Sequence, residues 1–232
     1  MRKYFVLTIL FVLPLVVYLF FASGINHFAK LPVLTKDVKD ISSISSESLK
    51  DKITVLGFFG KNIEDKYGDA GNLNQEIFKR FNEFKDFQFV MIQPKGTKSL
   101  TDELVREMNR LTKTNFKNWK FVTMSDEDLV SVFNSLKTDL ELDSNLGTSH
   151  VFIIDRKGNL RGRDDREGTK FGYDSRFVAD INNNMVDDVK VILAEYRMAL
   201  KKIIFIKINL NEKVLLCRYF ICYFDFWNYF LP

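Results

Sequence analysis

Ile53-Thr54-Val55-Leu56-Gly57-Phe58-Phe59-Gly60 is the stretch that decides the fold of this chain. It is short and almost wholly apolar, has β-branched residues at its start, and ends with a glycine. Such a run is typical of a strand that is covered on both faces, in a parallel or mixed sheet. A polar loop over 61–71 follows, and the pattern predicts a helix from Asn72. Strand, loop and helix together form the first half of an α/β unit.

The loop after this strand is the place where a ligand or partner is expected, because open α/β sheets bind ligands beyond the carboxyl ends of central strands. The stretch from Lys61 to Gly71 contains no cysteine, no histidine and no phosphate-binding glycine pattern. The sequence therefore predicts a fold and a place for binding without a chemical activity. It favours a protein that is not an enzyme.

Composition excludes several classes of function. The 232 residues carry a formal net charge of only +4, with both signs mixed along the chain. We expect no nucleic-acid binding, because there is no block of basic residues interleaved with aromatic ones. The two cysteines, Cys217 and Cys222, both lie near the C-terminus. A disulfide framework and dithiol chemistry are therefore excluded from the region upstream.

The N-terminus predicts a membrane segment. Arg2 and Lys3 precede an apolar stretch over 4–21, which is close to the roughly 20 residues that cross a bilayer as a helix. We predict a single transmembrane or signal-anchor segment over 1–23, with the N-terminus in the cytoplasm and the domain exported to the periplasmic or extracellular side. The alternative is a signal peptide that is cleaved near Ala22 and Gly24.

Four parts follow from the pattern of the chain. After the membrane segment, residues 24–47 form a tether and the edge of the domain, with a short extended piece at Leu31-Pro32-Val33-Leu34. Residues 48–202 form the domain itself. Residues 203–232 are an atypical tail rich in aromatic and aliphatic residues. This tail is interpreted either as a second membrane-associating segment or as an accidental extension of the chain.

Within the domain, apolar spacing predicts alternating helices and strands. The second helix should bury Leu100, Leu104, Met108 and Leu111, and the third, capped by Ser125, should bury Leu129, Val130, Phe133 and Leu136. A hairpin is predicted over 149–163 and a final helix over 183–201. The further predicted strands span 87–92 and 119–124. The order βα, βα, βα, ββα predicts an α/β fold with a central mixed sheet flanked by helices.

This order resembles the thioredoxin fold with an N-terminal extension, and is most similar to the peroxiredoxin-like branch that includes the SCO/SenC proteins. The resemblance covers roughly 45–200. It is carried by the entry strand Ser48-Leu49-Lys50-Asp51-Lys52-Ile53 with the residues up to Gly60, and by the hairpin Val151-Phe152-Ile153-Ile154-Asp155-Arg156-Lys157-Gly158-Asn159-Leu160. An N-terminal membrane anchor is also a property of that family.

The departures from the family bear on function. SCO/SenC proteins bind copper, and support cytochrome oxidase assembly or thiol reduction, through a Cys-x-x-x-Cys motif after the first core strand and a distant histidine. Here the loop from Lys61 has neither cysteine. Ser149 stands where thioredoxins have a cis-proline. His150 lies near the region where the copper histidine would be expected.

Six residues are the candidates for a site. His150 is the candidate metal ligand, for copper, although a histidine that is hydrogen-bonded at a strand end is the favoured explanation, since one histidine without a second soft ligand makes a poor metal site. The other five form an expected partner-docking surface beside the loop, made of Phe59, Lys61, Tyr67, Ser149 and Tyr173.

The sequence thus predicts a membrane-anchored, SCO/SenC-like domain without redox cysteines, which acts as a non-catalytic binding or assembly module for a protein partner. One alternative is a copper-binding factor for respiratory oxidase assembly that uses His150 and non-cysteine ligands. A second alternative, a thiol-dependent oxidoreductase, is disfavoured by the missing cysteines.

Overall fold

A computed structural model describes residues 9–10, 12–14, 16–17, 30–112, 114, 116–165 and 168–200. The predicted membrane segment lies mostly, and the 203–232 tail wholly, outside these residues. None of the helices within the described ranges combines the length and the apolar character needed to span a bilayer.

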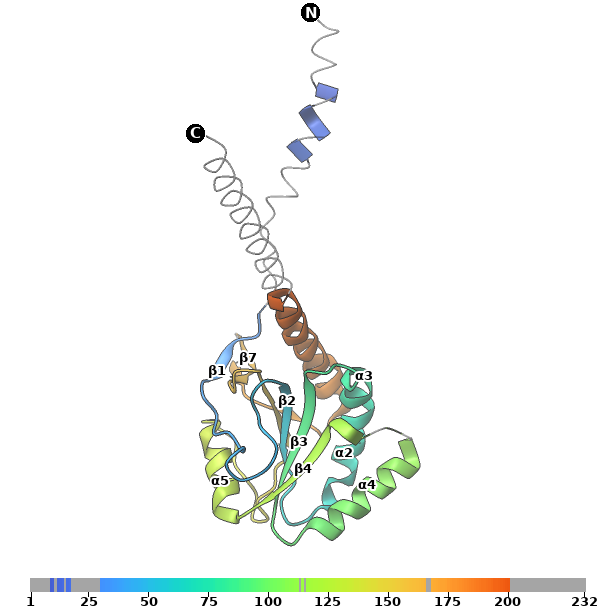
Figure 1. The fold of residues 1–232 in the computed structure, drawn as a ribbon, viewed down its shortest axis with the longest axis vertical. Coiled ribbons are helices and arrows are strands. Elements are labelled where there is room, and N and C mark those ends of the chain that lie inside the picture. The colour runs from blue at the N-terminus through green and yellow to red at the C-terminus, as the bar shows by residue number, and fades with distance from the viewer. Residues whose placement is uncertain are drawn as a thin grey trace, which may run out of the picture.

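The centre of the domain is a mixed sheet (Figure 1), whose strands are hydrogen-bonded in the order β1-β6-β5-β2-β3-β4. The main strands are β1 (Val33–Thr35), β2 (Ile53–Phe58), β3 (Phe87–Pro94), β4 (Trp119–Met124), β5 (His150–Ile154) and β6 (Leu160–Arg161). The parallel part is β2-β3-β4, with Ile53 opposite Phe87 and Phe89 opposite Trp119. β5 runs antiparallel to β2, so the predicted mixed sheet and hairpin are confirmed.

Helices cover both faces of the sheet. In Figure 1, α5 lies on one side, while α2, α3, α4 and the helical residues 186–200 lie on the other. Their bounds are α2 (Tyr67–Leu73), α3 (Lys79–Phe81), α4 (Lys98–Thr112), α5 (Asp126–Ser135) and α6 (Val178–Asp180). The 3-10 helices are η1 (Glu64–Lys66) and η3 (Phe116–Asn118), and the π-helical segments are η2 (Asn74–Phe78) and η4 (Ile181–Met185).

Three short strands complete the described chain. β7 (Arg163–Asp165) pairs with β8 (Gly168–Lys170) in a separate antiparallel ribbon. β9 (Tyr173–Asp174) pairs with the start of β5, so that His150 lies opposite Asp174. Sequence periodicity does not predict these strands, because each is too short for a period-two pattern to show.

Strand alternation distributes β2 between two apolar cores, one on each face of the sheet. Val55 belongs to the core under α2 and the 186–200 helix, whereas Leu56 belongs to the core under α5. All six residues of β2 are buried, as the uninterrupted apolar run predicted. Burial of side chains of this size contributes about 1.5–3 kcal/mol each.

The first helix begins earlier than predicted. Helical structure starts at Glu64, and α2 at Tyr67, and not at Asn72. Gly68 and Gly71 conceal this start in the sequence, because glycine disfavours a helix interior. The helix then passes through one π-helical segment, η2, before α3.

Two predicted apolar stripes need correction. In α4, Leu111 is 66% exposed and Leu100 is only half-buried, whereas Thr101 is buried. In α5, Val132 is buried and Val130 is only half-buried. The predicted cap of α5 is confirmed, since the amide of Asp128 donates to the Ser125 hydroxyl over 3.2 Å.

The last helix also starts earlier than predicted, at Val178, and runs through η4 into residues 186–200. Arg161 connects the C-terminal part of this helix to the start of the described domain at Leu31. This buried side chain donates to the Leu31 carbonyl (2.8 and 2.5 Å), to Asp155 (3.2 Å) and to Glu195 (2.7 Å). Both ends of the described domain therefore leave from one pole, at the top of Figure 1.

Candidate functional site

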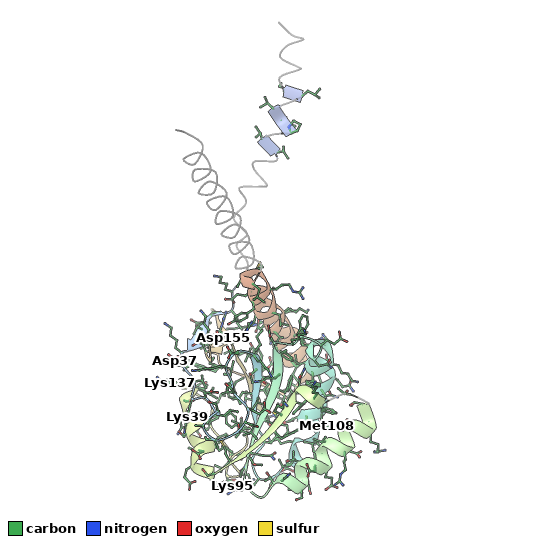
Figure 2. The ribbon with its side chains drawn as sticks, in the orientation of Figure 1. Asp37, Lys39, Lys95, Met108, Lys137 and Asp155 are labelled. Carbon is green, nitrogen blue, oxygen red and sulfur yellow. The ribbon has the colours of Figure 1, made fainter. Side chains whose placement is uncertain are left out.

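The carboxyl ends of β2, β3 and β4 meet at the opposite pole, where Figure 2 labels Lys95 just after β3. This is the edge at which the loop after β2 was expected to bind. The start of β5 reaches the same edge, because β5 is antiparallel to β2. The structure therefore brings 60–69 together with 143–150, although these segments are far apart in the sequence.

Backbone contacts fix the first turn of the loop. Gly60 has a φ of +71°, and a Cβ there would lie 2.5 Å from the Asn145 carbonyl oxygen and 2.6 Å from the Gly147 nitrogen. The Lys61 amide donates to that same carbonyl over 2.8 Å, and the Thr148 amide donates to the Phe58 carbonyl over 2.9 Å. Only glycine can adopt this positive φ without strain and also leave room for the backbone of residues 145–147 to approach so closely.

Beyond this turn, Lys66 and Asp69 lie buried at the start of the first helix. The Lys66 Nζ donates to the Ser149 Oγ over 3.1 Å and lies 3.7 Å from the Asp69 Oδ2. The two charged side chains are only 11% and 8% exposed. The Asp69 Oδ2 is buried and has no hydrogen-bond partner, so the nearby ammonium is its electrostatic compensation.

Ser149 connects this pair to the strand β9. Its carbonyl accepts from the Ser175 amide over 2.8 Å and from the Ser175 hydroxyl over 2.5 Å. On the other side, the Asn72 side chain donates to the Ser175 carbonyl over 3.0 Å. The first helix, β5 and β9 are thus joined by polar contacts through Lys66, Ser149 and Ser175. We call Lys66, Asp69, Ser149 and Ser175 the polar cluster.

An ion pair closes the outer side of the cluster. The Arg176 guanidinium contacts Asp174 at 2.6 and 3.0 Å. Burial raises the pKa of the Asp174 carboxyl, but hydrogen bonds from the Arg176 side chain and amide outweigh burial and hold that pKa below its usual value. Asp174 is therefore an anion at neutral pH, beside His150 on the paired strand.

Three of the five predicted docking residues lie where a partner can reach the site. Lys61 is exposed and forms an ion pair with Asp126 over 2.9 Å. Tyr67 lines an open groove of about 460 Å³ with Glu103, Arg106, Glu107 and Arg110. Ser149 is half-buried in the polar cluster.

The other two predicted docking residues are corrected by the structure. Phe59 is 3% exposed and packs in the core, with its ring 6.2 Å from that of Phe121. Tyr173 is wholly buried, and its hydroxyl donates to Asp188 over 2.6 Å. Strand alternation directs Phe59 inward, and the pairing of β9 with β5 covers Tyr173, so neither side chain contributes to a surface.

His150 is half-buried at the first position of β5, and its amide donates to the Thr148 hydroxyl over 3.2 Å. Within the described parts of the chain, no group of three or more His, Cys, Asp or Glu side chains is arranged to hold a metal ion. Asp174, which lies opposite His150 on β9, is already paired with the Arg176 guanidinium. The residues present do not fit a copper centre of the kind the resemblance implies.

The sequence did not single out Lys66 and Asp69. Their spacing of three residues is that of neighbours on one helical turn, and this was the available signal. The sequence pattern predicts a helix only from residue 72, so it assigns both residues to a loop. Their contact with Ser149 depends on the antiparallel placement of β5, which no local pattern encodes.

Comparison with known proteins returns matches among solved structures alone. No protein-family model matches the chain, and no curated protein does. BsSco, a member of the Sco family of cytochrome c oxidase assembly proteins, is 16% identical, with a TM-score of 0.45 over 69% of this chain and 92% of its own. A putative protein disulfide isomerase from Bacteroides thetaiotaomicron is 14% identical, with a TM-score of 0.43 over 74% and 98%.

The third structure is that of Arabidopsis thaliana ScoI with copper bound, which is 16% identical, with a TM-score of 0.35 over 61% of this chain and 86% of its own. The similarity is to Sco and thioredoxin-like proteins. This agrees with the resemblance predicted from the entry strand and the hairpin. At such low identities and TM-scores, the likeness carries no argument about activity, ligand or partner.

Proposed function

We propose that this chain is a membrane-anchored, exported binding or assembly module with a Sco-like thioredoxin fold, and that it carries out no redox chemistry. Residues 4–21 would anchor it, and the domain would lie on the periplasmic or extracellular side. A protein partner would dock at the pole that carries Lys61 and Tyr67.

The polar cluster is the observation that carries this proposal. At the edge of the sheet where the resembling proteins have two thiols, this chain has a buried ammonium bound to a hydroxyl and paired with a carboxylate. None of these groups exchanges electrons with a disulfide, because that reaction requires a thiolate. The contacts join three elements, so the cluster provides a rigid support for a docking surface.

Crosslinking in cells tests the docking surface. A photo-reactive residue is placed at Lys61 and, in separate chains, at Tyr67 and at Lys157, which is exposed in the hairpin turn at the other pole. We expect Lys61 and Tyr67 to crosslink to the same protein, and Lys157 not to do so. Lys61→Glu should abolish crosslinking from Tyr67. Equal crosslinking from all three positions would contradict the proposal.

Copper titration and thiol assays test the two rival functions. The chain with Cys217→Ser and Cys222→Ser is titrated with Cu(I) and Cu(II), with and without His150→Ala, and the unsubstituted chain is assayed for disulfide reduction. We expect no copper binding that depends on His150, and no reductase activity. Tight one-to-one binding that is lost in His150→Ala would replace our proposal with the copper-binding factor.

A further inference from the structure

An apolar groove lies near the pole from which both chain ends leave. It has a volume of about 320 Å³ and runs between the end of the first helix and residues 186–200. Phe81, Phe84, Leu193, Ala194 and Met198 form its apolar lining, and the side chains of Lys190 and Arg197 also line it. Lys190 is paired with the exposed Asp187 over 2.9 Å. The Arg197 guanidinium lies over the Phe84 ring, 5.7 Å from its centroid.

The charge around this groove is positive toward the chain end. After Glu195, which is paired with Arg161, the sequence Tyr-Arg-Met-Ala-Leu-Lys-Lys over 196–202 has three cations and no acidic residue. Leu200, in the last described turn, is 44% exposed. Long basic side chains that flank exposed apolar ones suit the boundary between lipid headgroups and acyl chains.

The chain itself would hold this pole close to a bilayer. Arg161 fixes Leu31 to the last helix through the Leu31 carbonyl and Glu195. Only residues 22–30 separate Leu31 from the apolar stretch at 4–21, and a segment of that length spans at most about 30 Å. Figure 1 shows that the pole with the docking site is the opposite one.

We propose that the groove and its two basic side chains form a lipid-contacting face, which seats the domain on a bilayer that contains anionic headgroups. This inference rests on the proposed membrane anchor. The groove receives acyl-chain or glycerol groups, while Lys190 and Arg197 contact lipid phosphates. The domain is then held with Lys61 and the polar cluster directed away from the membrane, toward a soluble or neighbouring partner.

The test uses the full chain in nanodiscs, with Cys217→Ser and Cys222→Ser so that a fluorophore can be attached at one new position. Ala194→Cys places the label in the groove, and Lys95→Cys places it at the opposite pole. The discs contain phosphatidylcholine alone or with phosphatidylglycerol, and a fraction of the lipid carries a nitroxide quencher. Quenching reports contact with lipid at each position.

We expect quenching at position 194 and none at 95, with stronger quenching in the anionic discs and weaker quenching at high salt. Each basic residue near an anionic surface contributes about fivefold to such an equilibrium, so Lys190→Gln with Arg197→Gln should reduce the anionic enhancement strongly. The proposal is overturned if the label at position 194 is quenched no more than the label at position 95. It is also overturned if the label at 194 is quenched equally in the two kinds of disc. Energy transfer between copies labelled at 194 also overturns it, since a second copy would then fill the groove.

Co-purification with the discs separates the two proposals. A chain that stays in the discs without quenching at 194 refutes the lipid-contacting face and leaves the anchor standing. A chain that does not associate with the discs refutes the anchor, and the lipid-contacting face with it.

Discussion

At the scale of single residues, the buried pair of Lys66 and Asp69 is the most consequential feature. Lys66→Met leaves the Asp69 carboxylate buried without a cation, and should cost about 3 kcal/mol of the free energy of unfolding. The double variant with Asp69→Leu should recover most of that loss, because both charges are then gone. Urea denaturation followed by circular dichroism measures both values.

Lys61→Met is the matched control for this prediction. The Lys61–Asp126 pair has a shorter separation, 2.9 Å, but its side chains are 50% and 48% exposed. Its loss should therefore change stability by less than about 1 kcal/mol. If Lys66→Met lowers the free energy of unfolding by no more than Lys61→Met does, then the buried Lys66–Asp69 pair does not stabilise the fold in the way stated.

Asp180 provides a prediction about pH. Burial raises the pKa of this carboxyl, but Lys170, Asn184 and the Asp174 amide bond to it and hold the pKa below 3.8. A pKa that is lower in the folded state gives stability that is present above about pH 4 and is lost as the pH falls further.

Asp180→Asn should accordingly flatten the acid limb of the stability curve: the parent chain should lose more stability than the variant between about pH 5 and pH 3. Asp187→Asn is the control, because Asp187 is exposed and its pKa is lowered mainly by a hydrogen bond from the exposed Lys190 over 2.9 Å. Added salt should remove the contribution of Asp187 to the pH dependence of stability, but should only reduce the contribution of Asp180. Parallel curves for the parent and Asp180→Asn would contradict this account.

At the scale of elements, a glycine in the turn after β2 and a glycine inside α2 respond oppositely to substitution by alanine. Gly60→Ala should cost at least about 2 kcal/mol, since its φ is +71° and the new methyl meets backbone atoms under 3.0 Å away. Gly71→Ala should stabilise the chain by about 0.5–1 kcal/mol, because position 71 is helical and nothing lies within 4 Å of the added Cβ. Thermal unfolding of both variants checks the signs. A neutral Gly60→Ala would show that the turn is not held by the contact with 145–147.

At the scale of the whole molecule, Arg161 couples the two ends of the domain. Arg161→Met should cost about 3–5 kcal/mol, because it leaves the buried Asp155 without its cation and frees the Leu31 carbonyl. Hydrogen exchange should show lost protection in β1 and in 186–200, with β2, β3 and β4 much less affected.

Lys120→Met serves as the comparison, since the Lys120–Glu47 pair is 34% and 27% exposed and Lys120 lies in β4. It should leave exchange in β1 and in 186–200 unchanged. Uniform loss of protection across the sheet in Arg161→Met would mean that Arg161 stabilises the fold as a whole and does not couple the ends specifically.

The sequence by itself determined the order of the elements, the buried central strand, the hairpin and the Ser125 cap. These depend on local periodicity and capping, which short stretches of sequence encode directly. It also determined that the loop after β2 has no thiol. It misplaced the start of the first helix, because Gly68 and Gly71 have a low helix propensity that tertiary packing overrides.

Only the tertiary structure decided which residues meet. Lys66, Asp69 and Ser149 come together because β5 runs antiparallel to β2, and Phe59 and Tyr173 are withdrawn from the surface by strand alternation and by the pairing of β9. The two chain ends share a pole through Arg161. Such contacts join residues up to 130 positions apart, and their energies depend on burial, which a local pattern does not contain.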